Sequence, residues 1–134
     1  MRLFVTGGTG FIGSHFIKLA IAERHEVIAL RREGSKSVIS LDPQPKWITG
    51  DLSSVPDEAL TGCDVFIHLA AHGVTSPTSV SWKDCFHWNV TQSLELWLQA
   101  ARLGLRRFVI CGSCFEYGTA ANRFDYIPVN APLE

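Results

Sequence analysis

A chain of 134 residues, 46% hydrophobic and 19% charged, has the size and composition of a single globular domain, residues 1–134. Its net charge is -1, and its basic residues come no denser than the pairs Arg31-Arg32 and Arg106-Arg107, which argues against nucleic acid or a membrane surface as partner. No apolar run is long enough to span a membrane, and the N-terminus leads directly into a strand. We therefore expect a cytoplasmic protein without a signal peptide that binds small molecules.

The N-terminal strand and helix are joined by a glycine-rich loop. Arg2 to Thr6 reads as a short buried strand, and helical spacing of apolar residues begins at Phe11. The pattern Gly-x-x-Gly-x-x-Gly is formed by Gly7, Gly10 and Gly13, the first two between the strand and the helix and the third within the helix. It lets the backbone approach a pyrophosphate and places the N-terminus of the helix at the phosphates. The alternative is a tight turn without a ligand. We assign the loop to dinucleotide binding, with these residues: Gly7, Gly10, Phe11, Ile12 and Gly13.

Four more apolar runs follow at intervals typical of a parallel sheet. They are Glu26 to Leu30, Trp47-Ile48, Asp64 to Leu69 and Arg107 to Cys111, separated by helical or loop segments. This alternation predicts an α/β fold, a doubly wound parallel sheet of the Rossmann type, with its ligand crevice at the carboxyl ends of the strands. We expect the strand at 107–111 to lie at an exposed edge.

The longest predicted helix runs from Trp82 to Leu103, and Gly104 is its expected C-cap. Six apolar residues are expected to form the stripe that packs on the sheet: Phe86, Val90, Leu94, Trp97, Leu98 and Ala101. Three more lie off this stripe and predict cover by another helix or a partner subunit, which favours a homodimer: Cys85, Trp88 and Leu96.

The cysteines and histidines do not have the spacing of a metal site. Cys111 and Cys114 form a CxxC, but no second close pair accompanies them, and Phe115 to Gly118 reads as a loop rather than the helix of a redox motif. His68 and His72 straddle the end of a strand, where a spacing of four does not place them on one helical face. We predict no metal and a structural or substrate-facing role for both histidines.

Five motifs in order resemble the extended short-chain dehydrogenase/reductases, the family of nucleotide-sugar epimerases and dehydratases. The motifs are GGTGFIG, GDL at 50–52, HLAA at 68–71, the asparagine of WNV at position 89, and GSCFEYG at 112–118. The resemblance covers essentially the whole chain. It implies NAD(P) as cofactor and a nucleotide sugar as substrate of the complete enzyme.

The resemblance also implies roles for single residues. Asp51 and Leu52 correspond to an adenine-contacting turn, although Asp51 is equally suited to cap the following turn. Leu69, Ala70 and Ala71 are small enough to let a ribose or nicotinamide lie against backbone, and small packing residues would look the same.

Two polar residues complete the implied site. Asn89 lies in an apolar helix and needs a hydrogen-bond partner, which in the family is active-site backbone or water. Ser113 follows the last strand and corresponds to the active-site serine that polarises a substrate oxygen. A loop serine without a chemical role is the alternative.

The residues after the second strand bear on the choice of cofactor. Members that use NAD carry an acidic residue about 20 positions beyond the glycine loop, to bind the ribose 2′-hydroxyl. Arg31 and Arg32 stand there instead, and a guanidinium is suited to a 2′-phosphate. We expect NADP, with NAD as the alternative.

The family's Tyr-x-x-x-Lys pair is not found in this sequence. Tyr117 and Tyr126 are followed, four positions later, by Ala121 and Asn130. The chain therefore resembles the N-terminal portion of such an enzyme, with an unfinished sheet, no substrate lobe and incomplete catalytic machinery. Two hypotheses stay open: the cofactor-binding part of an NADP-dependent epimerase, dehydratase or reductase, and a non-catalytic dinucleotide-binding sensor or interaction module.

Overall fold

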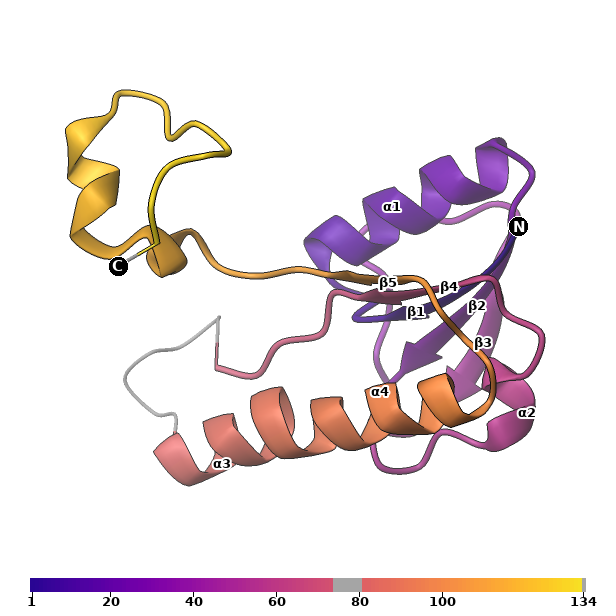
Figure 1. The fold of residues 1–134 in the computed structure, drawn as a ribbon. Helices are drawn as coiled ribbons and strands as arrows, with labels where there is room; N and C mark the ends of the chain where they lie inside the picture. Colours follow the sequence, from indigo (N-terminus) through magenta and orange to yellow (C-terminus); the bar gives the residue numbers. More distant parts are fainter. Residues whose placement is uncertain (74–80, 134) are drawn as a thin grey trace.

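Five parallel strands form one sheet in the order β3-β2-β1-β4-β5 (Figure 1). The computed structural model describes residues 1–73 and 81–133, without the side chain of Cys114. The strands are β1 Arg2–Thr6, β2 Glu26–Arg31, β3 Lys46–Thr49, β4 Val65–His68 and β5 Phe108–Ile110. The chain runs outward from β1 to β3 and returns to β4, so the strand order reverses between β1 and β4, as the predicted Rossmann fold requires. The expected edge position of β5 is confirmed.

Helix α1, Phe11–Ala22, covers one face of the sheet (Figure 1). Successive residues of a strand point to opposite faces, so alternate residues of β1, Leu3 and Val5, face α1. They pack with Ile17 and Ala20 of the helix, and all four are at most 5% exposed. This layer fixes α1 against β1 and thereby fixes the loop between them.

The opposite face is covered by α2, Asp57–Leu60, and α4, Ser93–Arg102. Phe4 and Phe66 lie side by side on neighbouring strands with ring centroids 5.3 Å apart. Leu96 and Ala100 of α4 pack in the same cluster and are almost completely buried. Both faces of the central strands are therefore buried, which explains why these strands read as continuous apolar runs.

The long helix expected at 82–103 is a continuous helical run with a π-helical middle: α3 Trp82–Phe86, η1 His87–Gln92 and α4. It ends as predicted at Gly104, which has φ 97°. Within the described residues, no helix has both the length and the apolar character needed to cross a membrane.

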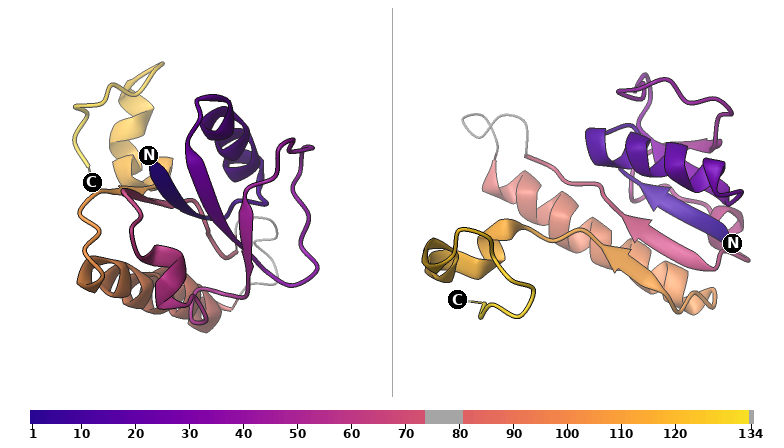
Figure 2. Two further views of the ribbon diagram at one scale, coloured as in Figure 1. Left: turned by 90° about the vertical axis from the view of Figure 1, so that its right-hand side faces the viewer. Right: turned by 90° about the horizontal axis from the view of Figure 1, so that it is seen from above.

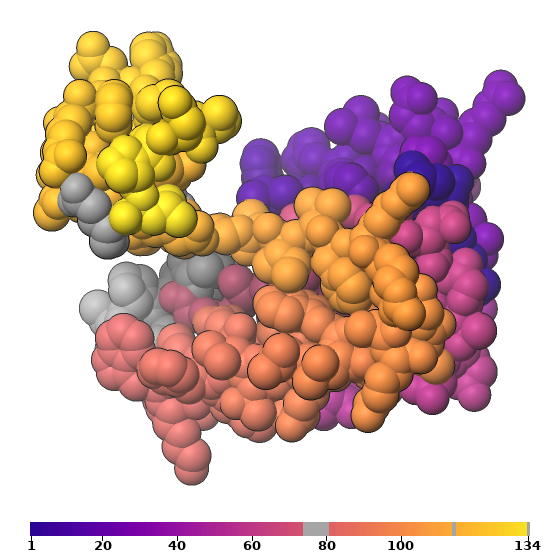
Figure 3. All heavy atoms as spheres, in the orientation of Figure 1, coloured from indigo at the N-terminus to yellow at the C-terminus, as the bar shows by residue number. Residues whose placement is uncertain are grey.

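The predicted orientation of this helix was wrong. Leu96, expected off the sheet, is 1% exposed in the core, and the partly buried Trp97 packs beside it. Most of the predicted sheet-facing stripe is exposed instead, on the long helix drawn in salmon and orange in Figure 3. These exposed residues are Phe86, Val90, Leu94 and Leu98, each between 48% and 62% exposed. The close approach of Ser93 and Ala100 to the sheet, both with small side chains, sets the buried face.

Beyond β5 the chain leaves the sheet and ends in a small separate segment (Figure 2). It contains η2, a 3-10 helix over Cys114–Arg123, where the sequence predicted a loop at Phe115 to Gly118. A capping box starts this helix, and Gly118 interrupts it with φ 51° and ψ -133°. Short helices of this kind have no apolar periodicity that a sequence reading can detect.

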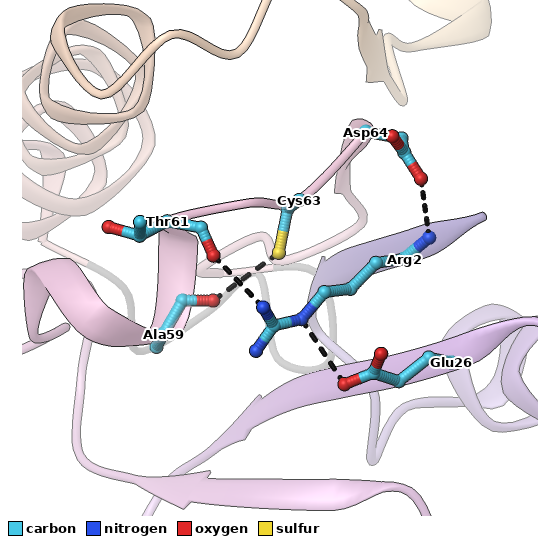
Figure 4. Close-up of polar contacts among 6 residues, drawn as sticks. All are labelled: Arg2, Glu26, Ala59, Thr61, Cys63 and Asp64. Atoms are coloured by element: carbon cyan, nitrogen blue, oxygen red, sulfur yellow. Dashed lines mark hydrogen bonds and ion pairs between the residues drawn. The ribbon is translucent and has the colours of Figure 1, made fainter.

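A polar cluster ties the elements together at the amino edge of the sheet, away from the glycine loop (Figure 4). The Arg2 guanidinium pairs with Glu26 at 3.2 Å and donates to the Thr61 carbonyl at 3.1 Å. The Arg2 backbone N-H donates to the Asp64 carboxylate at 2.7 Å. These contacts hold β1, β2 and the start of β4 in register at the edge opposite the crevice.

Candidate functional site: a dinucleotide crevice

The glycine loop places three glycines at positions with three different requirements. Gly7 has φ 69°, and a Cβ there would lie 2.5 Å from the Leu69 carbonyl carbon. A Cβ on Gly13 would overlap the Gly7 carbonyl, so this glycine lets α1 pack against the loop. Gly10 is exposed, and a Cβ there would meet only the Gly7 oxygen, at 3.3 Å. Gly7 and Gly13 are thus needed by the protein itself, whereas the space at Gly10 is open to a ligand.

Within the described residues, no side chain covers the N-terminus of α1 with a hydrogen bond. Gly10 is its N-cap, no side chain caps it, and its first turn holds no acidic residue. The first N-H groups of a helix have no intrahelical partners, and they carry a partial positive charge. Phe11 and Ile12 begin the helix with exposed side chains. Backbone donors and open space at Gly10 therefore fit a pyrophosphate.

The opposite wall of the crevice is the segment after β4. The Leu69 N-H donates to the Thr6 carbonyl at 3.3 Å, and Gly7 lies against Leu69 and Ala70. Asn89 binds the backbone of His72 twice, accepting from its N-H at 2.7 Å and donating to its carbonyl at 3.0 Å. Residues Leu69 to Ala71 are thus anchored at both ends, and the helix asparagine holds backbone, as its position in an apolar helix required.

Asp51 lies at the end of β3 and binds its own turn. Its Oδ1 accepts from the Ser53 N-H at 2.9 Å and from the Ser53 hydroxyl at 2.6 Å. The Ser53 hydroxyl bond is the main cause of a lowered pKa of this carboxyl. Hydrogen bonds from the Ser54 side chain and backbone lower the pKa further, so the carboxylate is held by the turn that follows it. Leu52 packs against the core.

A pocket of about 240 Å³ lies at the end of β2, and the sequence indicated only part of it. Its lining contains two cations and no carboxylate. The lining residues are Arg31, Lys36, Ser37, Ile39, Ser40, Leu41, Gln44 and Trp47. Arg32 is exposed and does not line it. The Val38 N-H donates to the Thr9 carbonyl at 3.2 Å, so the loop that carries Lys36 folds back onto the glycine loop.

Arg31 is held over an aromatic ring, and among the described residues its terminal nitrogens have no partner. Its guanidinium carbon lies 5.3 Å from the centre of the Trp47 ring, and its Nε donates to the Thr49 hydroxyl at 3.5 Å. In the part of the chain that the structure describes, no carboxylate pairs with Arg31 or Lys36. A charge that is oriented but not neutralised is suited to an anionic ligand.

Ser113 lies beyond the carboxyl end of β5, where the Cys111 N-H donates to the His68 carbonyl at 3.0 Å. Its Oγ accepts from the Phe115 N-H at 3.2 Å, and its own N-H donates to Glu116 at 2.8 Å. The serine therefore caps η2, and its hydroxyl oxygen acts as acceptor in this cap. Cys111 is exposed, and the CxxC cannot be followed further because the Cys114 side chain lies outside the described part.

His68 is buried, in line with the structural role that the sequence analysis allowed, but its partners were not predicted. Its ring nitrogens lie 2.9 Å from the Thr6 hydroxyl and 3.2 Å from the Ser93 hydroxyl, and burial lowers its pKa from 6.5 to about 4. Nothing in the sequence brings these three residues together, because 62 and 25 positions separate the histidine from its partners.

No three His, Cys, Asp or Glu side chains of the described residues form a metal-binding group.

Comparisons with known proteins place the chain in one family. Residues 3–134 match the model of the NAD dependent epimerase/dehydratase family. UDP-glucose 4-epimerase of Corynebacterium glutamicum is 26% identical over 99% of this chain and 40% of its own.

Solved structures give the same result. MoeE5 in complex with UDP-glucuronic acid and NAD is 28% identical, with a TM-score of 0.74, over 88% of this chain and 38% of its own. TunA, an NAD dependent NDP-hexosamine 5,6-dehydratase, is 25% identical, with a TM-score of 0.78, over 99% of this chain and 43% of its own. The chain thus spans less than half the length of these relatives. With the family model matched over almost all of its residues, the chain belongs to the NAD dependent epimerase/dehydratase family.

Proposed function

We propose that this chain is the cofactor-binding portion of an NADP-dependent nucleotide-sugar epimerase, dehydratase or reductase. The observation that carries the proposal is the uncapped N-terminus of α1 beside Gly10, facing the anchored backbone of Leu69 to Ala71 where the strand order reverses. Backbone donors at the start of α1 hold the pyrophosphate. The Asp51 carboxylate receives the adenine amino group, and the segment after β4 supports the ribose and nicotinamide.

The pocket at the end of β2 supports NADP over NAD. A 2′-phosphate needs cations with free donors, whereas a 2′-hydroxyl is selected by a carboxylate acceptor. Arg31 and Lys36 supply two unpaired cations, and Ser37 and Ser40 add hydroxyl donors. The relatives described above include a complex with NAD, so they give no support for NADP. The preference for NADP is therefore tested on this chain.

Wild-type protein is expected to bind NADPH at least about tenfold more tightly than NADH, since each charge-assisted hydrogen bond contributes about 1.5–3 kcal/mol. Arg31→Asp and Lys36→Ala should each reduce or reverse this preference. Arg32→Ala is the matched control, because Arg32 lies next to Arg31 in the sequence but outside the pocket. Isothermal titration calorimetry with both nucleotides makes the measurement. Tighter binding of NADH by the wild type, or an unchanged preference in Arg31→Asp, would contradict the NADP assignment.

Ser113 is the proposed substrate-contacting residue. The bound nicotinamide supplies a hydride acceptor or donor, and the Ser113 hydroxyl donates a hydrogen bond to the reacting oxygen of the sugar. The backbone N-H of Phe115 orients this hydroxyl, because it occupies one of its lone pairs. Proton transfer to or from the sugar hydroxyl requires an acid-base group beyond Ser113.

We further propose that the enzyme is a homodimer in which the exposed apolar stripe of the long helix is buried. Phe86, Val90, Leu94 and Leu98 recur every four residues, which places them on one face of the helix. Light scattering should give twice the monomer mass for the wild type and the monomer mass for Leu94→Lys. Thr91→Lys, an equal charge on a neighbouring exposed position of the helix, should remain dimeric. A monomeric wild type would rule out this interface.

A further inference from the structure

His68 is buried between the sheet and the long helix, where a charged imidazole is unfavourable. His68 is the last residue of β4. Its ring stacks beside Phe66 and makes a T-shaped contact with Trp97, and the centroids of the His68 and Trp97 rings are 5.2 Å apart. Burial is the cause of its low pKa of about 4, so the ring is neutral at pH 7. A neutral imidazole carries one proton, and which nitrogen holds it is decided by its neighbours.

The hydroxyl groups on either side of the ring allow one assignment that satisfies every polar group. Ser93 has one hydroxyl proton, which it donates to the Trp88 carbonyl at 2.9 Å. Its Oγ must therefore accept the proton of His68 Nε2. Nδ1 is then an acceptor, and it receives the Thr6 hydroxyl at 2.9 Å. Thr6 Oγ1 in turn accepts the Ala70 N-H at 3.4 Å.

This chain of hydrogen bonds runs from the crevice wall to the helix. At one end, the Ala70 N-H belongs to the segment that lies against Gly7. At the other, Trp88 lies in the π-helical turns of η1, which also present Asn89 to the backbone of His72. π-Helical turns are rare and occur frequently at functional sites. The same stretch of helix thus fixes both ends of the wall, one through Asn89 directly and one through Ser93, His68 and Thr6.

We propose that His68, held in its Nε2-H form by Ser93, is a positioning residue that fixes the Ala70 backbone for the ribose and nicotinamide of the dinucleotide. The proposal rests on the proposed function, because it needs a dinucleotide in the crevice. His68 touches neither cofactor nor substrate in this role. It acts through Thr6, whose hydroxyl both donates to the ring and accepts from the wall.

The test combines a spectroscopic and a binding measurement on the full chain. Long-range ¹H-¹⁵N NMR at pH 7 should show Nε2 protonated and Nδ1 unprotonated in the wild type. Calorimetry should then show NADPH binding about tenfold weaker in His68→Phe, which keeps an aromatic ring but lacks both nitrogens. Thr6→Val should weaken NADPH binding by a similar factor, because valine has the shape of threonine but can neither donate to His68 nor accept from the Ala70 N-H. Thr6→Ser retains the hydroxyl and should restore wild-type affinity.

The possible outcomes separate this inference from the proposed function. If the wild type binds neither NADPH nor NADH, the proposed function fails, and this inference fails with it. If the wild type binds but carries the proton on Nδ1, or if folded Thr6→Val binds as the wild type does, only the positioning role is overturned. Should Thr6→Val not fold, Ser93→Ala removes the acceptor of Nε2-H and decides the question by the same two measurements.

Discussion

Gly10→Val is expected to abolish dinucleotide binding while the protein stays folded. Among the described residues, a Cβ added here meets only the Gly7 oxygen, and the backbone at this position, φ -72° and ψ 175°, suits valine as well as glycine. The two methyl groups of valine would occupy the space in front of the first N-H groups of α1. Losing two charge-assisted hydrogen bonds to the pyrophosphate would weaken binding by about 100-fold or more.

Calorimetry with NADPH measures the loss, and circular dichroism with thermal melting verifies the fold. Ala22→Val is the matched control, because it adds the same branching at the exposed, opposite end of α1. It should bind like the wild type. If Gly10→Val keeps its affinity, the loop is a turn and the pyrophosphate does not lie at this helix.

Gly13→Val is expected to have the opposite signature, a loss of folding. Already the Cβ of alanine would overlap the Gly7 carbonyl and lie 2.9 Å from the Gly8 Cα, so the helix would have to move off the sheet. Ile17 and Ala20, at 0% and 5% exposure, would then lose their packing on Leu3 and Val5. Overpacking against backbone in this layer should lower the free energy of unfolding by about 3 kcal/mol or more.

Urea titration followed by tryptophan fluorescence measures this difference, and Gly10→Val serves as the control at equal side-chain volume. A midpoint for Gly13→Val that equals that of Gly10→Val would mean that α1 tolerates displacement. The glycine spacing would then reflect the ligand alone and not the contact between helix and strand.

Local features of the sequence were sufficient to predict the sheet and the glycine loop. The strands are short apolar runs, and a glycine pattern between strand and helix has few structural interpretations. The buried face of the long helix was mispredicted because apolar residues occur on two sides of it. The decisive positions are Gln92 and Ser93, two polar residues that are buried, with Gln92 Nε2 bound to Glu95 and the Ser93 hydroxyl bound to His68. A reading based on apolar periodicity counts such residues as exposed.

The rest of the candidate site depends on contacts between distant parts of the chain. Arg31 was assigned from its position after a strand, but Lys36 joins it only because Val38 binds Thr9 across the start of α1. Arg32 follows Arg31 directly but does not line the pocket, which charge alone does not reveal. The partners of His68 are likewise set by the pairing of β1 with β4 and the docking of α4.

The π-helical turns of η1 also separate the orientations of the two halves of the long helix. Each residue of an α-helix advances the side-chain direction by about 100°. In the wider turns at His87–Gln92, each residue turns the side-chain direction by less than 100°. The side chains of α4 therefore point in directions that a continuous α-helix from α3 would not give them. The helix can therefore direct Asn89 at the crevice wall and Leu96 at the core. In a uniform α-helix, one rotation about the helix axis would have to orient both side chains.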